Sequence, residues 1–167
     1  MSPRAAWRLE SLDFTEVYEY AAGEADWLAF GLPSEGRHAD TPRAGHIARS
    51  DVPTCSLREG MGEIRDRVKT AGWDECLVVN DQTVVLGRLR GAALAASAET
   101  MAEAVMEPGP TTTRPDEPLT KLVPRLRDKH VERIIVTTPD GRLVGIAERH
   151  AAERALAERE DTEDDRD

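Results

Sequence analysis

The side chains that could carry out chemistry are few, and their spacing does not form a catalytic or metal centre. Cys55 and Cys76 are the only cysteines, and they make neither a metal-binding nor a redox motif. His38 and His46 flank Asp40, but no fourth ligand and no tight spacing support a metal site there. We therefore expect structural thiols, linker histidines, no bound metal and no disulfide framework.

The carboxylates and glycines after residue 58 do not form a catalytic site or a phosphate-binding loop either. Glu59, Glu63 and Asp66 lie close together on one expected helix, and a solvated helical face explains them better than paired acid–base catalysis. The glycines of the same segment are not followed by Lys-Ser or Lys-Thr, so they do not form a phosphate-binding loop. The sequence therefore predicts a protein that is not an enzyme.

Charge and hydropathy exclude other classes. The 167 residues carry a net charge of −10, and residues 157–167 hold seven acidic side chains against two arginines. This balance excludes a broad basic surface for nucleic acid and argues against binding to an anionic membrane. No run of about 18 apolar residues is present, so no membrane span is expected. We expect a cytoplasmic protein with a disordered acidic tail at 158–167.

The aromatic residues divide the chain. Six of the seven aromatic side chains lie within the first 30 residues, and only Trp73 follows them. A stretch rich in proline, glycine and polar residues (33–45) separates the two parts and is typical of a linker. We therefore expect an N-terminal segment (1–36), a linker (37–45) and a body whose core is built from aliphatic residues.

The body contains an internal repeat. Residues 56–94 align without a gap on residues 114–152 when the chain is shifted by 58 positions. Apolar residues spaced as on one helical face coincide, and two short strand patterns follow them in each copy. The unit is β-α-β-β-α, and we place the copies at 46–98 and 99–157. The fold class is α/β (α+β).

A single copy is too small to bury both faces of its sheet. Two copies related by a pseudo-twofold axis would bury their sheets against each other and leave two equivalent clefts at the seam. Strand ends and helix N-termini would meet in these clefts and offer free N–H groups to an anionic ligand.

The paired unit resembles a tandem cystathionine β-synthase (CBS) domain pair, or Bateman module, over roughly residues 43–157. The matching segments are the openings of the two copies, the strands after them and the strands that carry the family's glycine: Ile47-Ala48 and Val105-Met106; Val52-Pro53-Thr54 and Thr111-Thr112-Thr113; Leu77-Val78-Val79 and Ile135-Val136-Thr137; and 85–89 and 143–147. The resemblance implies a regulatory module that binds an adenine nucleotide (AMP, ADP or ATP) or S-adenosylmethionine in its clefts, and that forms a homodimer.

The chain departs from the family's adenosine-binding pattern in both copies. That pattern places Thr or Ser three residues after the glycine and Asp three residues later. Here Arg90 and Ala93 follow Gly87 at those positions. In the second copy Glu148 and Ala151 follow Gly145. Loss of the carboxylate removes an acceptor for the ribose hydroxyls, so ordinary binding of AMP or ATP is in doubt.

Basic side chains near the replaced positions are expected to bind a phosphate in place of the family's hydroxyl and carboxylate. Arg88 and Arg90 would face a phosphate in the first cleft, and Arg149 and His150 in the second, with a salt bridge between Arg90 and Glu148 across the pseudo-twofold axis. The alternative is that these are solvated charges at helix starts. The expected ligand-binding residues are Thr54, Val79, Arg88, Arg90, Thr112, Thr113, Thr137, Glu148, Arg149 and His150.

The N-terminal segment is similar to the C-terminal end of a rhodanese-like domain. Gly23, Trp27 and the tripeptide Gly31-Leu32-Pro33 carry the resemblance, with a helix, a strand around 17–20 and a second helix expected. No cysteine stands before the first helix, where that family has its nucleophile, so the segment is interpreted as non-catalytic. Its aromatic face is expected to pack on the body or on a dimer partner. An unrelated helical extension remains the alternative.

Three functional interpretations stay open. In one, the chain is a ligand-sensing regulatory module that acts on a protein partner. In the second, it is a structural dimerisation module with vestigial clefts. The third is a sulfurtransferase whose catalytic part is lost or supplied elsewhere.

Overall fold

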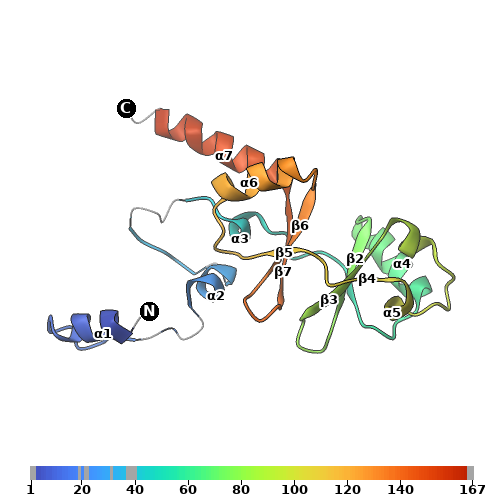
Figure 1. The fold of residues 1–167 in the computed structure, drawn as a ribbon, viewed down its shortest axis with the longest axis horizontal. Helices are drawn as coiled ribbons and strands as arrows, with labels where there is room; N and C mark the ends of the chain where they lie inside the picture. The colour runs from blue at the N-terminus through green and yellow to red at the C-terminus, as the bar shows by residue number, and fades with distance from the viewer. Residues whose placement is uncertain (1–2, 19, 21–22, 31, 37–40, 165–167) are drawn as a thin grey trace.

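A computed structural model describes residues 3–18, 20, 23–30, 32–36 and 41–164. It contains two small sheets with helices packed on them, and an N-terminal segment at one edge (Figure 1). The expected α/β architecture with two β-α-β-β-α units is confirmed.

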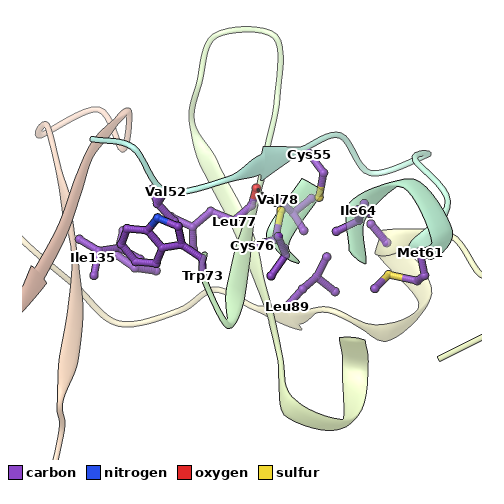
Figure 2. Packing of buried hydrophobic residues seen from close by; sticks show 13 residues of the cluster. Val52, Cys55, Met61, Ile64, Trp73, Cys76, Leu77, Val78, Leu89 and Ile135 are labelled. Atoms are coloured by element: carbon purple, nitrogen blue, oxygen red, sulfur yellow. Dashed lines mark hydrogen bonds between the residues drawn. The ribbon is translucent and has the colours of Figure 1, made fainter. Parts of the chain in front are cut away.

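The first unit is built around an aliphatic core. Its elements are α3 (Ala44–Ile47), β1 (Thr54–Cys55), α4 (Met61–Ala71), β2 (Glu75–Val79), β3 (Val85–Arg90) and the 3-10 helix η1 (Gly91–Ala95). Met61, Ile64 and Val68 lie on one face of α4 and are buried, because their spacing brings them to the same side of the helix. They pack on the sheet residues shown in Figure 2. Gly72 ends the helix at a φ of 70°.

The second unit repeats this plan. Its elements are α5 (Ala102–Val105), β4 (Glu107–Pro108), β5 (Thr112–Thr113), α6 (Leu119–Asp128), β6 (Arg133–Thr137), β7 (Leu143–Glu148) and α7 (Arg149–Asp164). The buried side of α6 is formed by Leu119, Leu122, Val123 and Leu126. In each sheet the first strand is parallel to the second, and the third is antiparallel to the second, so the register is the same in both units.

The two units exchange their opening segments. β4 pairs with β3 of the first unit, where Arg88 lies opposite Glu107. At the corresponding place in the second unit, Arg49 bridges Ile146 on β7. The hairpin ends also meet, through a bridge between Val84 and Arg142. Because these contacts recur at a spacing of 58 residues, they define the pseudo-twofold axis expected from the repeat.

Two expectations about helices are wrong. The helix expected at 92–98 is only the 3-10 helix η1, which ends at Ala95. The helix α7 continues to Asp164, so residues 158–164 are helical where composition predicted disorder. Residues 165–167 lie outside the described part of the chain.

The N-terminal segment contains two short helices, α1 (Pro3–Glu10) and α2 (Gly23–Ala29). The strand expected around 17–20 is wrong for residues 17, 18 and 20, which are irregular, and residue 19 lies outside the described residues. The expected packing of the aromatic face on the body is also not formed, since Trp7, Phe14 and Phe30 are exposed. Leu28 on α2 is buried, and Glu24 on the same helix pairs with Arg43 just before α3.

Candidate functional site

An open cleft of about 960 Å³ lies at the seam between the two units. One wall is the segment 107–111, which links the two units, and another is the stretch from the end of α6 into β6 (125–134). Arg88, Arg90 and Glu148 at the ends of β3 and β7 line it as well, together with His150 in the first turn of α7. We call it the repeat-2 cleft.

A buried carboxylate is among the groups that line the repeat-2 cleft. Glu75 is 1% exposed, and its Oε2 accepts a hydrogen bond of 2.6 Å from Nε of Arg88. Its Oε1 accepts a longer bond of 3.3 Å from Nη1 of Arg133. Arg133 also pairs with Asp74, and with Glu148 at 3.3 Å. The Arg133 guanidinium holds the pKa of the Asp74 carboxyl below its usual value. These arginines are therefore engaged within the protein.

Unlike these arginines, three other basic side chains in the cleft are not paired with any described residue. Among the described residues, no hydrogen bond or ion pair engages the side chains of Lys129, His130 or His150, and all three are exposed. Lys129 and His130 follow α6, and His150 lies in the first turn of α7, whose leading N–H groups have no acceptor within the helix. That turn contains no acidic residue. The arrangement can hold an anion such as a phosphate.

The salt bridge expected between Arg90 and Glu148 is wrong. Arg90 pairs with Glu107 at 3.3 Å, and Glu148 pairs with Arg133. The residues that do face each other across the pseudo-twofold axis are Glu75 and Arg133, which are separated by 58 positions. Sequence alignment could not identify this pair because it shows which positions are equivalent, but not which of them meet at the axis.

The structure brings four of the expected ligand-binding residues together in the repeat-2 cleft: Arg88, Arg90, Glu148 and His150. Arg149 stands next to them, but its guanidinium pairs with Glu132 and Glu153. These ion pairs of Arg149 stabilise the start of α7.

The remaining expected residues do not line this cleft. Thr54 lies on β1, and Val79 ends β2. Thr112 and Thr113 form β5, where the Thr113 hydroxyl donates to Glu117. Thr137 ends β6 and accepts a bond from Arg114 at its hydroxyl oxygen. The two bonded hydroxyls, on Thr113 and Thr137, therefore stabilise the second unit.

Sequence reasoning missed Lys129 and His130. In the shifted alignment they fall on Ala71 and Gly72, so the second unit carries two basic residues where the first has none. This difference between the two units was the sequence signal that could have identified Lys129 and His130. No group of three or more His, Cys, Asp or Glu side chains that could hold a metal is found in the described part of the chain.

Comparisons with known proteins agree with the fold. Residues 102–158, covering α5 to most of α7, match the CBS domain family. The crystal structure of CBSX2, a CBS-pair protein from Arabidopsis thaliana, in complex with AMP aligns with a TM-score of 0.62 at 18% identity, covering 71% of this chain and 98% of that one. The fold is that of a CBS-domain pair.

Two further solved structures extend the comparison. The cytosolic domain of the Mg²⁺ channel MgtE in complex with ATP gives a TM-score of 0.62 at 19% identity, over 70% of this chain and 50% of that one. The CBS pair of MJ0100 in complex with 5′-methylthioadenosine and S-adenosyl-L-methionine gives 0.58 at 15% identity, over 71% and 98%. The chain thus spans about half of the MgtE domain. No curated protein matches the chain.

None of the helices in the described residues combines the length and apolar composition that a membrane span requires.

Proposed function

We propose that this CBS pair is a non-enzymatic regulatory module that senses an adenine nucleotide or an adenosyl compound in the repeat-2 cleft. The observation that carries the proposal is the group formed by Lys129, His130 and His150, which all line the cleft and whose side chains have no partner among the described residues. Three basic side chains in one cleft, one of them in the first turn of α7, suit a phosphate, or the carboxylate of an adenosylmethionine.

Related structures support this class of ligand. Proteins of the same fold have been crystallised with AMP, with ATP, and with 5′-methylthioadenosine and S-adenosyl-L-methionine. Arg88 and Arg90 would orient the ligand from the other side of the cleft, and Glu148 would accept from a hydroxyl or amino group. Thr54, Val79, Thr112, Thr113, Thr137 and Arg149 would then act as supports behind the cleft.

In the mechanism we propose, ligand binding changes the relative orientation of the two units, which comprise residues 46–98 and 99–157. The repeat-2 cleft takes side chains from both units, so an occupant stabilises one arrangement over others by its differential affinity. We propose that the module acts as a cytoplasmic homodimer and passes this change to a protein partner.

The test is a thermal-shift panel with AMP, ADP, ATP, NAD and S-adenosylmethionine on the wild type and two lysine variants. K129A removes a cleft cation, and K121A removes an exposed lysine from the same region of the chain, on α6 and outside the cleft. A ligand at 100 times its Kd raises stability by about 2.7 kcal/mol, which is a shift of several degrees in a chain of this size. We expect the wild type and K121A to shift alike, and K129A to need about tenfold more ligand. Equal responses of K129A and K121A would remove the proposed site.

The second candidate is a structural dimerisation module with vestigial clefts. The absence of the family's hydroxyl and carboxylate in both units favours it, since Arg90 and Ala93, and Glu148 and Ala151, stand in their places. Flat thermal curves with every ligand, together with a dimer in analytical ultracentrifugation, would favour this candidate over ligand sensing.

A further inference from the structure

The exposed large hydrophobic side chains are gathered in the N-terminal segment. Among the described residues they are Trp7, Leu12, Phe14, Tyr18, Phe30 and Met101, and only Met101 belongs to the body. Trp7 is 68% exposed and Phe14 is 58% exposed. The helix α1 lies apart from both sheets (Figure 1). Apolar side chains exposed together in this way mark a surface that binds a partner. We call residues 3–18 the aromatic arm.

The aromatic arm is a formed element. The backbone N–H groups of residues 11–14 donate hydrogen bonds to carbonyl oxygens of residues 7–10, which folds this stretch back onto the end of α1. Asp13 takes up the turn with a φ of 64°, a conformation that Asp adopts more readily than most residues. Trp7 and Phe14 are therefore joined by a hydrogen-bonded cap, so less chain entropy is lost when their side chains bind.

The charge of the arm restricts what can cover it. Residues 10–18 contain three acidic side chains, Glu10, Asp13 and Glu16, and no basic one. All three are exposed. An anionic membrane would repel them. The surface that fits the arm is therefore apolar where it meets the aromatic rings and basic around them.

The body carries a pocket with an apolar lining. It is open, has a volume of about 880 Å³, and lies between α4 and the segment from η1 to Glu107. Its apolar walls come from Val68, Trp73, Leu94 and Val105. Pockets of this volume hold a drug-sized ligand, so it has room for a few side chains. We call it the α4 pocket.

The charges around the α4 pocket are complementary to those of the arm. Its acidic residues, Asp74 and Glu107, are both paired with arginines. Arg65 and Lys69 on α4 have no carboxylate partner among the described residues, and Arg65 donates only to the backbone oxygen of Ala96, at 3.2 Å. The charge left uncompensated at the pocket is therefore positive, and it attracts the carboxylates of the arm.

The positions of the two surfaces favour a contact between chains. The helices α1 and α4 lie at opposite ends of the molecule (Figure 1). Two copies that each place the arm in the other's pocket make the same contact twice, as a twofold symmetric dimer requires. The second contact then forms within the complex and strengthens it.

We propose that the aromatic arm of one chain binds in the α4 pocket of a second copy, with its aromatic rings on the apolar walls and its carboxylates beside Arg65 and Lys69. The inference goes beyond the proposed function, because it concerns the partner of the arm and needs no ligand in the repeat-2 cleft.

The first test is sedimentation of the full chain over a range of concentrations. The double variant W7A and F14A removes two exposed rings of the arm, and M101A is the control because Met101 is exposed outside both surfaces. We expect the wild type and M101A to dimerise alike, and the double variant to dimerise about tenfold more weakly. A wild type that stays monomeric, or a double variant that dimerises like the wild type, would overturn the proposal.

The second test exchanges the charges and identifies the occupant as a second copy. One variant carries E10K and E16K in the arm, and the other carries R65E and K69E at the pocket. In a mixed pair each arm meets a pocket of opposite charge. We therefore expect the equimolar mixture to associate at least tenfold more tightly than either variant alone. A mixture no tighter than its components would overturn a contact between chains.

Two measurements accompany the charge exchange. K121E changes an exposed lysine outside the α4 pocket and should dimerise like the wild type. If the pocket variant does not fold, K69E alone is mixed with E16K and decides in the same way. The arm variant leaves the repeat-2 cleft intact, so its response to nucleotide tests the proposed function separately from the arm contact.

Discussion

Arg133 donates from Nη1 to Oε1 of Glu75 at 3.3 Å, and these residues occupy the same position in the two repeats. At a pseudo-twofold axis, equivalent residues can meet each other. Two identical acidic residues there would repel, and here the duplicated position carries opposite charges. The copies are therefore complementary at their contact, which favours the pairing of one unit with the other within the chain.

Removing the Glu75 carboxylate should destabilise the fold. Glu75 is 1% exposed and bonds Arg88 and Arg133, so E75A removes the carboxylate that these two guanidinium groups share. Because Arg133 is 31% exposed, we expect the low end of the range for a broken buried pair, about 3 kcal/mol. Urea unfolding measures it, with E63A, an exposed carboxylate on α4, as a control expected within about 0.5 kcal/mol of the wild type. Equal losses in the two variants would contradict this role.

The two equivalent glycines should differ in their tolerance of alanine. A Cβ on Gly145 would lie 2.4 Å from the backbone oxygen of Arg49, which is held by the bridge to Ile146. A Cβ on Gly87 would meet the Met106 side chain, which can move. We expect G145A to lose about 3 kcal/mol and G87A about 1 kcal/mol, from the usual range for overpacking. Thermal unfolding of both variants decides, and a greater loss in G87A would contradict the closer backbone contact at Gly145.

Stability should fall in acid partly through Asp74. A hydrogen bond from Arg133 lowers the pKa of this carboxyl in the folded state. The stabilisation is therefore fully present above the unfolded-state value of about 3.9, and it is lost as the pH falls through the lower folded-state value. Since Asp74 is 76% exposed, the effect is small. Urea midpoints at pH 7, 4 and 3 should change less in D74N than in the wild type, and identical pH profiles would exclude this contribution.

The cysteines should react only on unfolding. Cys55 on β1 and Cys76 on β2 are both buried. The adjacent Cys55 and burial raise the pKa of the Cys76 thiol, which keeps it protonated and unreactive at neutral pH. Labelling with a disulfide reagent such as DTNB should be slow in the native protein and complete in urea. Fast labelling of either thiol in the native protein would contradict their assignment to the core.

The repeat could be predicted from sequence because its signals are local. The spacing of Met61, Ile64 and Val68 and the buried strand 75–79 follow from the periodicity of helices and strands, and both form as expected. The turn after Thr137 is likewise encoded by its own residues, since Gly141 adopts a φ of 86°.

Other features could not be predicted because they depend on contacts between distant segments. The pairing of Arg88 with Glu107, and the stacking of Arg49 on Trp73, leave no trace in local periodicity. The acidic composition of 158–164 favours disorder, but this segment continues a helix that begins with apolar contacts on α6. The N-terminal resemblance remains a hypothesis without the strand it predicted.

The most direct test of the central claim is photolabelling with 8-azido-AMP, followed by peptide mapping. We predict labelling within the segments that line the cleft (74–75, 88–90, 107–111, 125–134 and 148–150), competition by unlabelled nucleotide, and loss of labelling in K129A but not in K121A. Labelling that maps to other segments, or that unlabelled nucleotide does not reduce, would contradict a ligand site in the repeat-2 cleft.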